Sequence, residues 1–72
     1  MTNVPQKIRD MWTDLYKLFD VHYTMDGTQA AWESFWNDAK DLYAKHNGNE
    51  RLNDGITLVA DWIADRLKEE QT

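Results

Sequence analysis

Two histidines are the first residues of this 72-residue sequence that could carry acid–base or metal chemistry. His22 and His46 are each the last residue of a row of apolar residues that recur at intervals of three and four, as on one face of a helix. They lie at the C-terminal ends of the first two predicted helices. Because neighbouring helices joined by short loops run antiparallel, these two ends should lie at opposite ends of the molecule. The histidines are therefore not expected to share a metal. The preferred interpretation is that each interacts with the C-terminal end of its own helix.

Six aspartates are spaced as pairs on the predicted helices, which is the second pattern that could support chemistry. A two-metal site in a helical bundle needs carboxylates that point inward together with Glu-x-x-His motifs. The helical periodicity instead places these pairs on the outer faces: Asp10/Asp14, Asp38/Asp41 and Asp61/Asp65. The sequence also lacks cysteine, a glycine-rich phosphate loop, a zinc-protease motif and an EF-hand loop. We therefore expect a protein that is not an enzyme, with no catalytic residues, cofactor or metal site.

The periodicity of the apolar residues predicts three helices, over residues 4–23, 27–46 and 50–70. Apolar side chains recur at intervals of three and four in each segment, with charged side chains between them. Short connections make neighbouring helices antiparallel. The predicted fold is all-α, a small up-down-up three-helix bundle that forms a single domain over residues 1–72, without a sheet or an internal repeat.

Local signals mark where these helices should begin. Asn3 is expected to cap the first helix, with Pro5 in its first turn. Asp26 and Thr28 are alternative caps for the second helix, and Asn49 should cap the third.

One glycine lies inside the third predicted helix. Gly55 costs about 1 kcal/mol relative to alanine there, so it could split the segment, with Asp54 capping the second part. We favour one continuous helix because the apolar spacing of residues 52, 56, 59, 63 and 67 passes through the glycine unbroken.

Aromatic residues are expected to supply most of the core. A small bundle needs large apolar side chains to bury enough surface. The six aromatic residues that fall on the apolar stripes are therefore predicted to be buried: Trp12, Phe19, Trp32, Phe35, Trp36 and Tyr43.

Two large apolar residues of the third helix do not fit the core. Leu58 and Trp62 point roughly 150° and roughly 110° away from the direction of its apolar stripe, and they are neighbours on the helix surface. Asp54, Asp61 and Asp65 surround them. A tryptophan and a leucine exposed within a rim of charge are typical of a protein-binding surface, so these five residues are the candidate binding site.

Two alternative interpretations of Trp62 need no partner. Its ring could stack on Arg66 as a cation–π pair within the same helix. It could also wedge between helices at the edge of the bundle. A helical wheel does not separate these arrangements from an exposed surface.

The charge balance excludes some partners. Thirteen acidic and eight basic residues give a formal net charge of −5, whereas nucleic-acid-binding domains normally carry a basic patch. No apolar segment is long enough to cross a membrane, and the N-terminal residues do not resemble a signal peptide. We therefore expect a cytoplasmic protein that binds neither nucleic acid nor membrane directly.

The aromatic residues also form a recognisable pattern. It runs W-x-x-L-Y-x-L-F from Trp12 to Phe19 and W-x-x-F-W-x-x-A-x-x-L-Y-A-K-H from Trp32 to His46. In this pattern the chain resembles short uncharacterised helical proteins encoded by Gram-positive bacteria, often within prophages or other mobile regions. The resemblance implies a small bacterial accessory protein and transfers no functional residue.

Together these features predict an accessory protein that binds a protein partner through the outward surface of the third helix. The partner could be a second copy, forming a homodimer, because self-association would add stability that a small core lacks. The alternative is an acidic decoy of the phage type, which would imitate a DNA backbone and occupy a nucleic-acid-binding protein.

Overall fold

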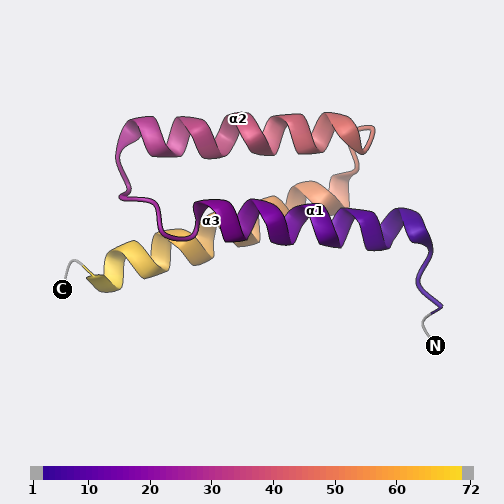
Figure 1. Cartoon of the computed structure of the whole chain (residues 1–72), viewed down its shortest axis with the longest axis horizontal. Coiled ribbons are helices and arrows are strands. Elements are labelled where there is room, and N and C mark those ends of the chain that lie inside the picture. Colours follow the sequence, from indigo (N-terminus) through magenta and orange to yellow (C-terminus); the bar gives the residue numbers. More distant parts are fainter. Residues whose placement is uncertain (1–2, 71–72) are drawn as a thin grey trace.

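The computed structural model of the chain describes residues 3–70, so the ends of the predicted domain, residues 1–2 and 71–72, lie outside the described part. It contains three helices: α1 (Gln6–His22), α2 (Gln29–Lys45) and α3 (Glu50–Glu70). α1 and α2 run antiparallel, and α3 returns in the direction of α1 at an inclination to it (Figure 1). Each helix contacts the other two, which confirms the predicted all-α, up-down-up three-helix bundle.

The first helix begins two residues later than predicted and ends at His22 rather than at residue 23. Pro5 has an extended backbone (φ −56°, ψ 147°) and precedes the first helical residue. Its carbonyl accepts hydrogen bonds from the backbone N–H groups of Ile8 and Arg9. Pro5 therefore takes the capping position predicted for Asn3, and its side chain makes no capping hydrogen bond.

Thr28 rather than Asp26 caps α2, which begins at Gln29 and not at residue 27, and ends at Lys45, one residue earlier than predicted. The hydroxyl of Thr28 accepts a hydrogen bond from the Ala31 backbone N–H at 3.2 Å. Asp26 supports this cap: its carboxylate accepts from the Thr28 backbone N–H at 3.0 Å and from the Thr28 hydroxyl at 2.8 Å. The backbone hydrogen bond from Thr28 is the main reason that the pKa of Asp26 is lowered.

A tight turn joins α2 to α3. Asn47 and Gly48 both have positive φ values, 61° and 69°, and glycine adopts this left-handed conformation without the steric cost that other residues carry. The side chain of Asn49 then accepts hydrogen bonds from the backbone N–H groups of Arg51 and Leu52, at 2.9 and 3.2 Å. Asn49 thus caps α3, as predicted.

The helices meet in one apolar core, and α3 is continuous through Gly55, as predicted. A Cβ atom at residue 55 would lie 2.7 Å from Cδ2 of Leu15, so the glycine permits the close approach of α1 and α3. The largest fully buried side chains are Phe35, Ile56 and Ile63. The remaining buried apolar residues are Met11, Leu15, Leu18, Ala39, Leu42, Leu52, Val59 and Ala60.

The prediction that six aromatic residues form the core is wrong for two of them. Trp12 and Trp36 are 66% and 48% exposed. Each directly follows a buried residue of its stripe, and one residue corresponds to a rotation of about 100°, which carries the indole to the edge of the core. The other four are buried or packed partly buried against the core: Phe19, Trp32, Phe35 and Tyr43.

Candidate functional site

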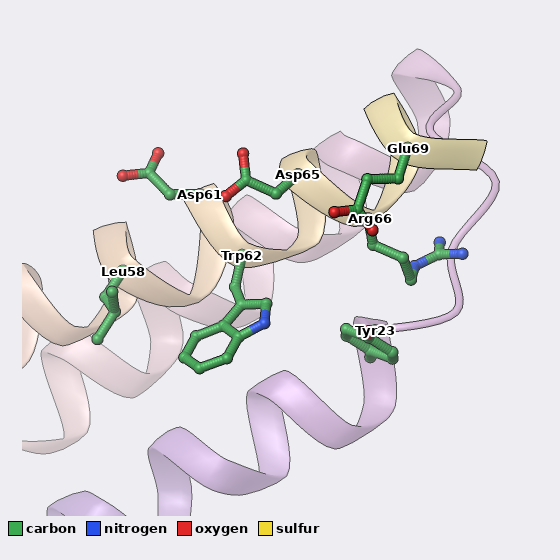
Figure 2. Close-up of a pocket in the computed structure, with 7 residues that line it drawn as sticks. All are labelled: Tyr23, Leu58, Asp61, Trp62, Asp65, Arg66 and Glu69. Carbon is green, nitrogen blue, oxygen red and sulfur yellow. The ribbon is translucent and has the colours of Figure 1, made fainter. Parts of the chain in front are cut away.

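The outward side of α3 carries a shallow hollow with large apolar side chains at its edge (Figure 2). Leu58 and Trp62 are 57% and 58% exposed. The hollow has a volume of about 240 Å³, and its lining residues are Tyr23, Leu58, Asp61, Trp62, Asp65, Arg66 and Glu69. The structure thus brings four of the five residues of the predicted site together around one hollow.

The fifth residue of the predicted site, Asp54, lines a different hollow. This second hollow has a volume of about 460 Å³ and lies between α1 and the first turns of α3. Ile8 and Trp12 from α1 line it together with Leu52 and Gly55 from α3. All three aspartates of the predicted rim are exposed. The second hollow therefore lies in the seam between α1 and α3, whereas the first is lined by α3 and by Tyr23, the residue directly after α1. The three aspartates are divided between the two hollows.

The ring of Trp62 leans toward α1 (Figure 2). Its centroid lies 5.9 Å from that of Phe19, with the ring planes at 60° in an edge-to-face contact. The predicted alternative of stacking on Arg66 is wrong, because the Arg66 guanidinium lies over the Tyr23 ring, 5.3 Å from its centroid. The contact with Phe19 holds one edge of the indole against the bundle and leaves more than half of the side chain exposed.

Arg66 closes one end of the hollow by joining α3 to the loop after α1. One guanidinium N–H group donates to the backbone carbonyl of Met25 at 2.5 Å, and another donates to the Glu70 carboxylate at 2.7 Å. The side chain of Arg66 is mostly buried. Its charge is therefore already paired, which reduces the positive potential that it adds to the hollow.

The exposed apolar surface continues onto α1, which the apolar periodicity did not predict. Ile8, Trp12 and Tyr16 are between 40% and 67% exposed and follow one another at four-residue intervals, so they share one side of α1. Two of them line the second hollow beside α3. We call these three residues together with Leu58 and Trp62 the α1–α3 surface.

The two histidines form a second arrangement that the sequence prediction missed. Nε2 of His22 in α1 lies 2.7 Å from Oδ2 of Asp38 in α2. Nε2 of His46, directly after α2, lies 2.7 Å from Oδ2 of Asp14 in α1. Both imidazole side chains are only 9% exposed. Each imidazole therefore binds a carboxylate of the facing helix, and not the end of its own helix as predicted.

Asp14 is the more enclosed of the two carboxylates. Its side chain is 14% exposed, against 55% for Asp38, so the prediction of an outer-face position is wrong for Asp14. Nζ of Lys45 lies 2.9 Å from the same oxygen that binds His46. These two contacts, with Lys45 the larger influence and His46 the second, hold the pKa of Asp14 below its ordinary value of 3.8.

A common spacing of 24 residues relates the two histidine–aspartate pairs. Adding 24 to the number of each of four residues in α1 gives an identical residue in or directly after α2. The matched residues are Trp12/Trp36, Asp14/Asp38, Leu18/Leu42 and His22/His46. Because α1 and α2 are antiparallel, the two equivalent contacts are related by an approximate local two-fold axis.

In each histidine–aspartate pair the imidazole and the carboxylate are hydrogen-bonded to each other, and the two pairs do not share a residue. Within residues 3–70, no group of three or more histidine, aspartate or glutamate side chains is placed to hold a metal ion. No helix in this part of the chain is long and apolar enough to cross a membrane. The pairs serve as hydrogen bonds between α1 and α2, and the α1–α3 surface is the candidate binding site.

Comparisons with protein-family models, with curated proteins and with solved structures each found no match for this chain. The resemblance to short helical proteins of Gram-positive bacteria and prophages stays a prediction.

Proposed function

We propose that this protein is a non-catalytic accessory protein that binds a protein partner on the α1–α3 surface. The observation that carries the proposal is Trp62, which is held edge-on against Phe19 and remains more than half exposed beside a hollow. A side chain that is already ordered loses little conformational freedom when a partner covers it. Tryptophan is also among the residues that most often dominate protein–protein binding energies.

The extent of exposed apolar surface supports the same proposal. All five side chains of the α1–α3 surface are exposed, and they come from two adjacent helices. Single exposed apolar residues are common in monomeric proteins, whereas a group of large ones is typical of a binding surface. Covering half of one such side chain contributes about 1 kcal/mol, so several together can hold a partner.

Charged residues surround this apolar centre. Asp61 and Asp65 line the first hollow with Leu58 and Trp62 but project from the other side of α3 (Figure 2), and Asp54 lies at the second hollow. A polar rim around an apolar centre is the usual composition of a protein–protein interface. The charged rim discriminates among partners by electrostatic complementarity.

The proposal is tested by isolating the tagged protein from cells that express it and identifying the proteins that remain bound to it. Tagged wild-type protein and a Trp62→Ala variant are isolated in parallel, and the proteins retained by each are compared. Trp36→Ala is the matched control, because Trp36 is an exposed tryptophan of α2 outside the α1–α3 surface. We expect one protein to be retained by wild type and by Trp36→Ala, and at least about tenfold less by Trp62→Ala. Retention that does not depend on Trp62 would contradict the proposal.

A second candidate function is an acidic decoy that occupies a nucleic-acid-binding protein. The observation in its favour is the formal charge of −5 together with three exposed aspartates on α3: Asp54, Asp61 and Asp65. Binding of this kind weakens steeply with added salt and does not depend on Trp62. Repeating the retention experiment at low and high salt therefore separates the two functions.

A further inference from the structure

We propose that the occupant of the α1–α3 surface is a basic amphipathic helix that lies along α3 and covers both hollows. An apolar side chain of this helix enters the hollow beside Leu58 and Trp62, and its lysine or arginine side chains lie next to Asp61 and Asp65. The inference rests on the proposed function, that this surface binds a protein, and adds the chemistry of the partner.

The two hollows lie along α3 at a spacing that suits a helix. The first hollow is lined by α3 residues between Leu58 and Glu69, and the second by the cap residue Asn49 and α3 residues between Arg51 and Gly55. The centres of these segments are about eleven residues apart, which corresponds to about 16 Å or three helical turns. A partner helix that lies along α3 presents apolar side chains from one face at this interval, as helices bound in apolar grooves do.

The charge around the first hollow indicates the charge of the partner. Three acidic residues and one basic residue line it: Asp61, Asp65, Glu69 and Arg66. Arg66 is already ion-paired with Glu70 and hydrogen-bonded to a backbone carbonyl. Asp61 and Asp65 therefore give the hollow negative charge beside the exposed side chains of Leu58 and Trp62. Lysine or arginine side chains of a partner complement this charge at short range.

The same charge disfavours a second copy of this chain as the occupant. Each copy carries a formal charge of −5, and a dimer through this surface would bring two acidic rims together. Repulsion between like charges opposes such an association. The anionic surfaces of nucleic acids and of acidic lipid membranes are disfavoured for the same reason.

Two synthetic peptides test the charge and the apolar contact separately. Both have about 18 residues, or five helical turns, with leucine along one face. The opposite face carries lysine in one peptide and glutamate in the other. Binding of each fluorescently labelled peptide to the full chain is measured by anisotropy at low salt. We expect the glutamate peptide to bind at least about tenfold more weakly than the lysine peptide.

Charge-reversed variants locate the binding site of the lysine peptide. The double variant Asp61→Lys/Asp65→Lys changes the net charge by the same amount as Glu33→Lys/Asp41→Lys, which alters exposed residues of α2. We expect the first double variant to weaken binding at least about tenfold more than the second. Circular dichroism checks that each variant stays helical. Equal effects of the two double variants would show general attraction to an acidic protein and would overturn the inference.

The apolar contact is tested by Trp62→Ala, with Trp36→Ala as the control. We expect only Trp62→Ala to weaken lysine-peptide binding, at least about tenfold. Equal binding of the lysine and glutamate peptides, both lost in Trp62→Ala, would overturn the basic partner but leave the proposed function intact. If neither peptide binds but a cellular protein is still retained through Trp62, the basic partner is likewise overturned and the proposed function stays intact. A wild-type dimer that Trp62→Ala dissociates would identify a second copy as the occupant and overturn the inference.

Discussion

At the scale of single residues, the two histidine–aspartate pairs connect α1 to α2 through nearly buried polar groups. An imidazole in this position needs a hydrogen-bond partner, since a buried polar group without one costs about 1–3 kcal/mol. His22 and His46 have this partner in Asp38 and Asp14. A shifted alignment of α1 and α2 would leave both imidazoles without partners, so the pairs favour one alignment over others.

Removal of Asp14 should destabilise the fold more than removal of Asp38. Asp14 is mostly enclosed and binds both His46 and Lys45, whereas Asp38 is more than half exposed and water can replace it. We expect Asp14→Ala to lower the free energy of unfolding by about 2 kcal/mol and Asp38→Ala by about 1 kcal/mol or less. Urea unfolding followed by circular dichroism measures both, with the exposed Asp41→Ala as the control. Equal losses in all three variants would show that the pairs add nothing specific.

The lowered pKa of Asp14 predicts how stability depends on pH. Its folded-state pKa lies below its unfolded value, so the folded protein binds this proton more weakly. The resulting stabilisation is present above the unfolded pKa and is lost as the pH falls through the folded value. We expect the urea concentration at the midpoint of unfolding to decrease for wild type as the pH is lowered below about 4. In Asp14→Asn this decrease should be less steep. Parallel curves for the two proteins would mean that Asp14 does not contribute.

The histidine–aspartate pairs were not predicted because a helical wheel describes each helix separately. It shows which side of a helix is apolar, but not which residues of a neighbouring helix lie opposite. The available signal was the common spacing of 24 residues, which relates His22 to His46 and Asp14 to Asp38. The exposure of Trp62, in contrast, followed from its angle on α3 alone.

At the scale of helices, the number and order of the elements followed from the apolar periodicity and the short connections. The first residues of α1 and α2 were not predicted correctly, because two residues compete for each capping position. Pro5 takes this position in place of Asn3, and Thr28 takes it in place of Asp26. The apolar periodicity predicts a buried Trp12, but the stripe defined by intervals of three and four is wider than the part of α1 that α2 and α3 cover. Trp12 lies in the uncovered part of this stripe.

The close approach of α1 and α3 predicts an unusual response to a substitution at Gly55. Alanine adds about 1 kcal/mol of helix propensity, but its Cβ would lie 2.7 Å from Leu15 Cδ2. Overpacking costs about 1–3 kcal/mol, so we expect Gly55→Ala to lower the free energy of unfolding by about 1 kcal/mol. In a Leu15→Ala background the obstructing atom is absent, and the same substitution should raise this free energy by up to about 1 kcal/mol. Urea unfolding gives both values, and a change of the same sign in both backgrounds would contradict the close approach.

At the scale of the whole molecule, the two seams of α1 differ in chemistry. The seam with α2 carries the two histidine–aspartate pairs. The seam with α3 carries the second hollow and the five exposed apolar side chains of the α1–α3 surface. A partner that covers the α1–α3 surface would bury apolar area on both helices at once, which is why we propose this surface as the binding site.

The net charge predicts that the protein alone is monomeric. Two copies joined through the α1–α3 surface would each contribute a formal charge of −5. Size-exclusion chromatography with light scattering should therefore give the mass of one chain for wild type and for Trp62→Ala at low salt, where like-charge repulsion is screened least. Dimeric wild type beside monomeric Trp62→Ala would instead assign the surface to self-association.

The most direct test of the binding surface is photo-crosslinking in cells that express the protein. A photoreactive residue replaces Trp12 on α1, Leu58 on α3 or, as the control, Trp36 on α2, which are all exposed positions. We predict that positions 12 and 58 form an adduct with the same partner protein and that position 36 forms none, because only the first two belong to the α1–α3 surface. An adduct from position 36 alone, or equal adducts from all three positions, would contradict the assignment of partner binding to this surface.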